Sequence, residues 1–123
     1  MKPNPAHLIV IATVVILILQ ASASAHAFLD HAEPRVGSAI SQAPSDVRIW
    51  FTQAVEPAFS RIEVFDAGGK RVDGKDAHVD PGDHHILIIS LPRLAAGTYK
   101  VSWRVVSVDT HRTQGDFKFT VKP

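Results

Sequence analysis

Short segments in which apolar and polar residues alternate run through the last hundred residues, and they restrict the fold more than any other feature. An apolar side chain on every second residue is typical of a β-strand with one buried face. Turn-forming Pro, Gly and Asp residues separate the segments, and no window of helical period competes with them. The pattern predicts an all-β protein, an antiparallel β-sandwich of about seven or more strands in one domain. The clearest segments are residues 47–52, 61–64, 86–89, 99–105 and 116–121.

The first 25 residues have the anatomy of a secretory signal peptide. Lys2 precedes a 12-residue apolar run at residues 8–19, and a stretch of small residues follows it. As a helix this run would span about 18 Å, short of the roughly 30 Å of a bilayer core, so an uncleaved anchor is the less favoured alternative. Cleavage after Ala25 is the prediction, although the small residues also permit cleavage after Ala23 or Ala27. We therefore expect a signal peptide at residues 1–25, a mature domain at residues 26–123, and a periplasmic location.

Composition excludes several classes of protein. Without Lys2, the 13 basic residues become 12, against 12 acidic residues, and a nucleic-acid binder would normally be more basic. The chain has no cysteine, which rules out disulfides, iron–sulfur clusters, thiol nucleophiles and blue-copper centres. The single methionine is Met1, so any metal must be bound by nitrogen and oxygen.

Cleavage after Ala25 would make His26 the N-terminal residue. Such a histidine offers two nitrogens, its α-amine and its imidazole Nδ1, which can chelate one metal ion. A nitrogen-rich tetragonal site suits Cu(II), the tightest-binding of the divalent first-row metals. The alternative is that His26 is a frayed terminal residue.

Asp109 and His111 form a second candidate feature, beyond the predicted strand at residues 99–105. Residues two apart on an extended chain point the same way, so this carboxylate and imidazole could meet one ion. Alone, the D-x-H pattern is more often a solvated loop. Together with His26 it would complete a set of amine, two imidazoles and a carboxylate.

The other histidines and the tryptophans are given structural roles. His78, His84 and His85 flank a Pro-Gly turn and could form a second metal site, but a polar turn with surface histidines is the favoured interpretation. His31 is treated as structural. Both tryptophans, Trp50 and Trp103, are expected in the core.

Four stretches of the mature chain carry recognisable motifs, at residues 26–38, 44–51, 91–99 and 101–115. The most specific is the last, the VSWRVVS segment with the Asp, His and Gly that follow it. Together the four stretches resemble the CopC family of small periplasmic copper-binding proteins, which are linked to copper resistance and uptake.

The resemblance implies a cupredoxin-like Greek-key β-sandwich that binds one Cu(II) through His26, Asp109 and His111. It also implies a copper carrier or store that works beside an inner-membrane CopD-like transporter. We expect a monomer. We do not expect an enzyme, because no Ser-His-Asp spacing, phosphate loop or pair of catalytic carboxylates stands out. The lack of methionine in the mature chain predicts no Met-rich Cu(I) site. Gln53 stands where the family often has an acidic residue near copper, so hydrogen bonding from Gln53 would replace that charge, with Glu56 as a weaker candidate.

Two other functions are compatible with these residues. One is a copper oxidative enzyme of the histidine-brace type, because an N-terminal histidine and a second histidine form such centres. Against it stand the small size and the extra carboxylate of Asp109, since catalytic metals keep an open position. The other is a metal-free β-sandwich module that interacts with periplasmic machinery.

Overall fold

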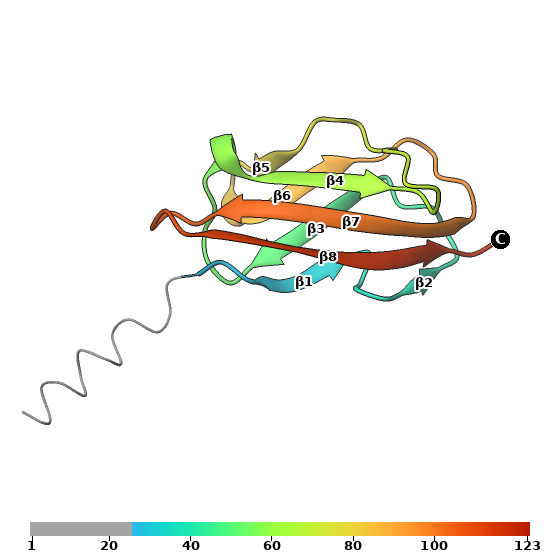
Figure 1. Ribbon diagram of the computed structural model, residues 1–123, viewed down its shortest axis with the longest axis horizontal. Helices are drawn as coiled ribbons and strands as arrows, with labels where there is room; N and C mark the ends of the chain where they lie inside the picture. The colour runs from blue at the N-terminus through green and yellow to red at the C-terminus, as the bar shows by residue number, and fades with distance from the viewer. Residues whose placement is uncertain (1–25) are drawn as a thin grey trace, which may run out of the picture.

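The structure is a computed structural model that describes residues 26–123. The signal peptide predicted at residues 1–25 lies outside the described residues. Eight strands and one short 3-10 helix, η1, make up the domain (Figure 1). In chain order they are β1 (Leu29–Glu33), β2 (Ala39–Ile40), β3 (Asp46–Phe51), η1 (Pro57–Phe59), β4 (Arg61–Phe65), β5 (His78–Asp80), β6 (Asp83–Ser90), β7 (Gly97–Val106) and β8 (Arg112–Val121).

The strands form two four-stranded sheets packed face to face, which confirms the predicted β-sandwich. One sheet has the order β1-β3-β6-β5 and the other β2-β8-β7-β4. Neighbouring strands are antiparallel except the two-residue β2, which pairs in parallel with β8. The five alternating or apolar segments of the sequence correspond to β3, β4, β6, β7 and β8.

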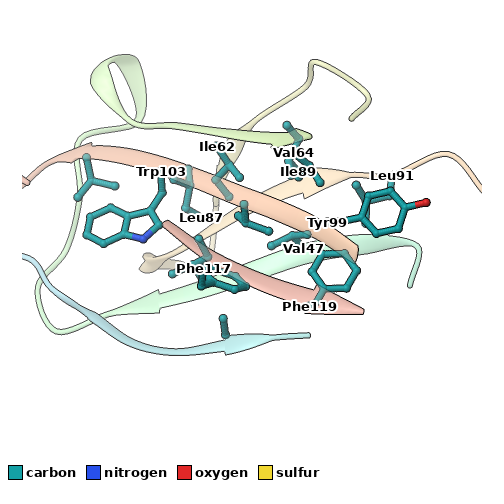
Figure 2. Close-up of a cluster of buried hydrophobic side chains, with 14 of the residues drawn as sticks. Val47, Ile62, Val64, Leu87, Ile89, Leu91, Tyr99, Trp103, Phe117 and Phe119 are labelled. Carbon is teal, nitrogen blue, oxygen red and sulfur yellow. The ribbon is translucent and has the colours of Figure 1, made fainter. Parts of the chain in front are cut away.

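The core consists of the inward-facing residues of both sheets (Figure 2). Along β7 the burial follows the alternation of the sequence, with every second residue from Tyr99 to Val105 buried. Phe119 of the neighbouring strand β8 is only 1% exposed. In the opposite sheet, Ile49 and Leu87 are completely buried. Full burial of one such side chain stabilises a protein by about 1.5–3 kcal/mol, so this layer holds the sheets together.

The two tryptophans occupy different environments. Trp103 is 7% exposed and packs edge-on against Phe51 at 5.2 Å between ring centroids, as expected of a core residue. The expectation for Trp50 is wrong, because this residue lies on the outer face of β3 and is only half-buried. Its ring is covered there by His31 of β1, stacked at 4.4 Å with 13° between the ring planes.

One end of the sandwich, here called the hairpin end, contains the β7–β8 connection at residues 107–111. The beginning of the described chain also lies there, on the left of Figure 1. Backbone hydrogen bonds connect the segment after β3 to this end: the Val55 N–H donates to the His84 carbonyl at 2.9 Å, and the Glu56 N–H donates to the Val106 carbonyl at 2.7 Å. Within residues 26–123, no helix is long and apolar enough to cross a membrane.

Candidate metal site

Hydrogen bonds from both sheets hold the chain directly after His26. The Thr113 hydroxyl of β8 donates to the Ala27 carbonyl, and Ala27 is completely buried. Directly after β3, Thr52 makes two hydrogen bonds with Phe28. The Phe28 N–H donates to Thr52 Oγ1 at 3.0 Å, and the Thr52 N–H donates to the Phe28 carbonyl at 2.8 Å. Ala27 and Phe28 are therefore anchored directly beside His26.

This anchoring places the His26 ring beside the ring of His111. Their centroids are 4.5 Å apart, with 73° between the ring planes, although the residues are 85 positions apart in sequence. The ring of Phe28 lies 6.0 Å from that of His26. Two of the three predicted ligands thus meet at the surface of the hairpin end.

A tight turn, not an extended strand, carries Asp109 and His111. The Thr110 N–H donates to the Ser107 carbonyl at 2.8 Å, and Thr110 has a φ of +71°. The expectation that strand alternation would align Asp109 with His111 is therefore wrong. A left-handed backbone is unfavourable for a β-branched residue such as threonine and costs glycine little.

The turn brings the Asp109 carboxylate to the His111 ring. Asp109 Oδ2 lies 3.2 Å from His111 Nδ1, and Asp109 Oδ1 accepts a hydrogen bond from the Ser107 hydroxyl. The Ser107 hydrogen bond is the main cause that lowers the pKa of Asp109, and His111 contributes less. Asp109 is therefore a carboxylate at neutral pH, and the Nε2 atom of His111 remains available to a metal when Nδ1 faces Asp109.

Sequence reasoning missed Ser107, Thr113 and Thr52, which organise the site. Ser107 continues the inward-facing series of β7 two residues after Val105, and it is completely buried. A polar residue at the end of a buried apolar series was the signal that could have identified it. Nothing in the local sequence distinguishes Thr113 or Thr52 from other surface threonines.

His26, Asp109 and His111 do not form a closed coordination group. No three His, Cys, Asp or Glu side chains within residues 26–123 are grouped so that they could hold a metal ion. In the uncleaved chain the His26 nitrogen is a peptide amide, so the amine of the predicted ligand set exists only after cleavage.

Gln53 and Glu56 lie on the segment that runs beside the hairpin. Gln53 is exposed and Glu56 is half-buried. The segment is fixed by a bridge between Val55 and Ser107 and by the Val108 N–H, which donates to the Ala54 carbonyl at 3.2 Å. A supporting role for either side chain stays a prediction.

The turn at residues 78–85 carries three more histidines. His78 and His85 each bond locally, His78 Nδ1 with the Asp76 carbonyl at 2.9 Å and His85 Nδ1 with Asp83 at 3.0 Å. His84 is exposed beside this turn. A second metal site at these histidines stays the less favoured prediction.

The fold and these residues define a class of protein. The CopC domain model matches residues 29–122, so the chain belongs to the CopC domain family.

Two solved structures and one curated relative illustrate the similarity. A crystal structure of CopC from Methylosinus trichosporium OB3b is 37% identical with a TM-score of 0.75, covering 80% of this chain and 95% of that one. PcoC, a methionine-rich copper resistance protein from Escherichia coli, is 34% identical with a TM-score of 0.68, covering 80% of this chain and all of that one. The copper transport protein CutJ of Bacillus subtilis is 30% identical over 91% of this chain, which spans about a fifth of CutJ, 21% of its length.

Proposed function

We propose that the mature protein, beginning at His26, binds one Cu(II) ion at the hairpin end. The ligands are the amine and imidazole of His26, the imidazole of His111 and the carboxylate of Asp109. The observation that carries the proposal is the 4.5 Å approach of the His26 and His111 rings. Three nitrogens and one carboxylate oxygen form a donor set that binds Cu(II) more tightly than most other divalent first-row metals.

The proposed role is to store or hand over copper in the periplasm as a monomer, beside an inner-membrane CopD-like transporter. Membership of the CopC family supports copper as the cargo. The methionine-rich PcoC differs from this chain, whose single methionine is Met1. Because a thioether is the soft ligand that selects Cu(I), we propose only the Cu(II) site.

A Cu(II) titration against a competing chelator tests the proposal. One protein begins at His26, and its matched control carries one extra residue, Met, before His26. The extra residue converts the amine into an amide, so we expect tight one-to-one binding only by the first protein. Equal affinity of both proteins would remove the amine from the ligand set, and no binding by either would refute the site.

The role of Asp109 is tested by comparing two substitutions. Asn at position 109 can still accept a hydrogen bond from His111 Nδ1 but has no negative charge. If Asp109 is a ligand, Asp109→Asn and Asp109→Ala should both weaken Cu(II) binding, because an amide oxygen is a poorer ligand than a carboxylate. If Asp109→Asn binds like the unaltered protein and Asp109→Ala does not, Asp109 only orients the His111 ring.

A copper-carrier function is favoured over oxidative catalysis if Asp109 binds the metal, because its carboxylate would then occupy a coordination position that an oxidative enzyme keeps open. In the structure Asp109 Oδ2 lies 3.2 Å from His111 Nδ1, so the carboxylate must turn away from Nδ1 to share a metal with Nε2. Ascorbate-driven peroxide formation by the copper-loaded protein, at a rate above that of free copper, would contradict the carrier function.

A further inference from the structure

A cationic cavity lies at the hairpin end, on the outer face of the sheet that contains β4, β7 and β8. Its volume is about 400 Å³, and its lining includes Arg61, Arg104 and Arg112 together with Phe59 of η1. Arg61 and Arg104 are direct cross-strand neighbours, and Arg112 follows His111 at the start of β8. These four residues are here called the arginine face.

Within residues 26–123, no ion pair fixes the charges of the arginine face, and its nearest acids on the same face, Glu63 and Asp116, lie opposite Ser102, one step farther along the strands. Among the described residues, no carboxylate lies within 4.0 Å of these three guanidinium groups, whereas Arg48 and Arg71 each have an aspartate partner. Like charges placed directly opposite on neighbouring strands destabilise a sheet. An anionic group bound between the arginines would offset this repulsion through charge-assisted hydrogen bonds.

Exposed apolar side chains surround the same end. Phe59 is 66% exposed, Phe28 next to His26 is 56% exposed, and Val108 in the hairpin is 54% exposed. They are three of the four large hydrophobic residues exposed within residues 26–123. Of these residues and the arginines, Phe28, Val108 and Arg112 are within two positions of a proposed copper ligand.

Lysines are found elsewhere in the described part of the chain. Lys100 and Lys118 are cross-strand neighbours in the half of the sheet farther from the hairpin. Lys70, Lys75 and Lys122 also lie away from the hairpin, in the β4–β5 connection and after β8. Protein interfaces are enriched in arginine and aromatic residues and depleted in lysine, so the hairpin end has the composition of an interface.

We propose that the arginine face docks a protein partner whose contacting surface is acidic and presents an apolar side chain to Phe59. This inference rests on the proposed function, because a partner bound there would face His26 and His111 and could exchange copper with them. A second copy of this chain does not suit the face. A two-fold symmetric contact centred on this face would bring the arginines of both copies together.

The test uses NMR on metal-free protein that begins at His26, titrated with a 12-residue peptide of Asp, Glu and Leu. A peptide with Asn and Gln in place of the acids is the control. We expect amide shifts around Phe59, Arg61 and Arg104 with the acidic peptide only. The double variant Arg61→Gln/Arg104→Gln should bind the peptide roughly tenfold more weakly.

The matched control variant is Lys100→Gln/Lys118→Gln, which removes the same charge from another cross-strand pair of the same sheet. This variant should bind the acidic peptide like the unaltered protein. Equal weakening in both variants would mean non-specific attraction and would overturn the proposal. It would also be overturned if citrate alone produced the same shifts at the same concentration, or if the shifts followed protein concentration without peptide.

Copper titration of the same proteins separates the two proposals. The variant Arg61→Gln/Arg104→Gln retains every proposed ligand and should bind Cu(II) with unchanged affinity. Peptide binding unaffected by this variant overturns the docking surface, whatever the copper result. Failure of the unaltered protein to bind Cu(II) overturns the metal site instead, and peptide binding at the arginine face would still support docking.

Discussion

The hydrogen bond from Thr113 to the Ala27 carbonyl should contribute to copper affinity although neither residue is a ligand. Thr113→Val keeps the branched shape of the side chain and removes the hydroxyl that anchors the residue after His26. A hydrogen bond of this type contributes about 0.5–1.5 kcal/mol net. If the anchoring is required for the bound geometry, Cu(II) affinity should fall roughly 2- to 13-fold.

The assay is competition of the protein with a Cu(II) chelator, using protein that begins at His26. Thr120→Val is the matched control, because Thr120 is also on β8 and its hydroxyl pairs with Thr98 at 3.0 Å, far from the hairpin. In the metal-free protein, NMR relaxation should show increased motion of Ala27 and Phe28 in Thr113→Val only. Unchanged affinity and unchanged motion in Thr113→Val would refute the anchoring argument, as would an equal loss of affinity in both variants.

Two further predictions concern stability. Gly115→Ala should destabilise the fold by about 1–3 kcal/mol in urea unfolding, because the new Cβ would lie 2.6 Å from Cζ2 of Trp103. The control Gly68→Ala meets only an ordinary contact and should change stability little; a similar loss in both would contradict the steric argument. Burial raises the pKa of Asp73, but hydrogen bonds from Arg71 and two backbone N–H groups outweigh it and lower the pKa overall. The charge of Asp73 therefore stabilises the fold above its unfolded pKa of about 3.9, and this stabilisation is lost as pH falls through the lower folded pKa. Asp73→Asn should flatten the loss of stability between pH 5 and 3, and a slope like that of the unaltered protein would contradict this assignment.

Much of the sheets was predictable because β3, β4, β7 and β8 each have one face in the core and one facing outward, whereas β6 buries three consecutive residues and was visible only as an apolar run. The alternation of the two faces repeats every two residues, and it is visible in the sequence from Tyr99 to Val105. The two-residue β2 and the short β5 have too few residues to show such a period. They form because their neighbours β8 and β6 offer free backbone groups at their edges.

Trp50 shows where residue type misleads. Its place in the alternation, between Ile49 and Phe51, assigns it to the outer face of β3, whereas its size favoured the core. The structure follows the alternation, and the stacking of His31 covers part of the ring. The whole strand decides the register, because turning Trp50 inward would turn all the remaining side chains of β3 to the wrong face.

The candidate site was predictable only in part. The resemblance to the CopC family pointed to His26, Asp109 and His111, and the structure places the two histidine rings together. The local geometry was not predictable, because strand alternation fails where Thr110 adopts a left-handed turn. The contact between Thr113 and Ala27 depends on how segments 86 residues apart are packed, which no local pattern contains.

The hydrogen bonds made by Thr52 and Thr113 would allow His26 to form a defined site once cleavage makes it the N-terminal residue. Thr52 directly follows β3 and Thr113 lies on β8, so each sheet contributes one threonine that hydrogen-bonds the chain after His26. Both bond the backbone of the residues after His26 and leave its imidazole uncommitted. The sandwich therefore restricts the position of His26 before any metal binds, which lowers the entropy that binding must overcome. A terminal histidine without such hydrogen bonds would offer the same atoms but would lose more conformational freedom on binding the ion.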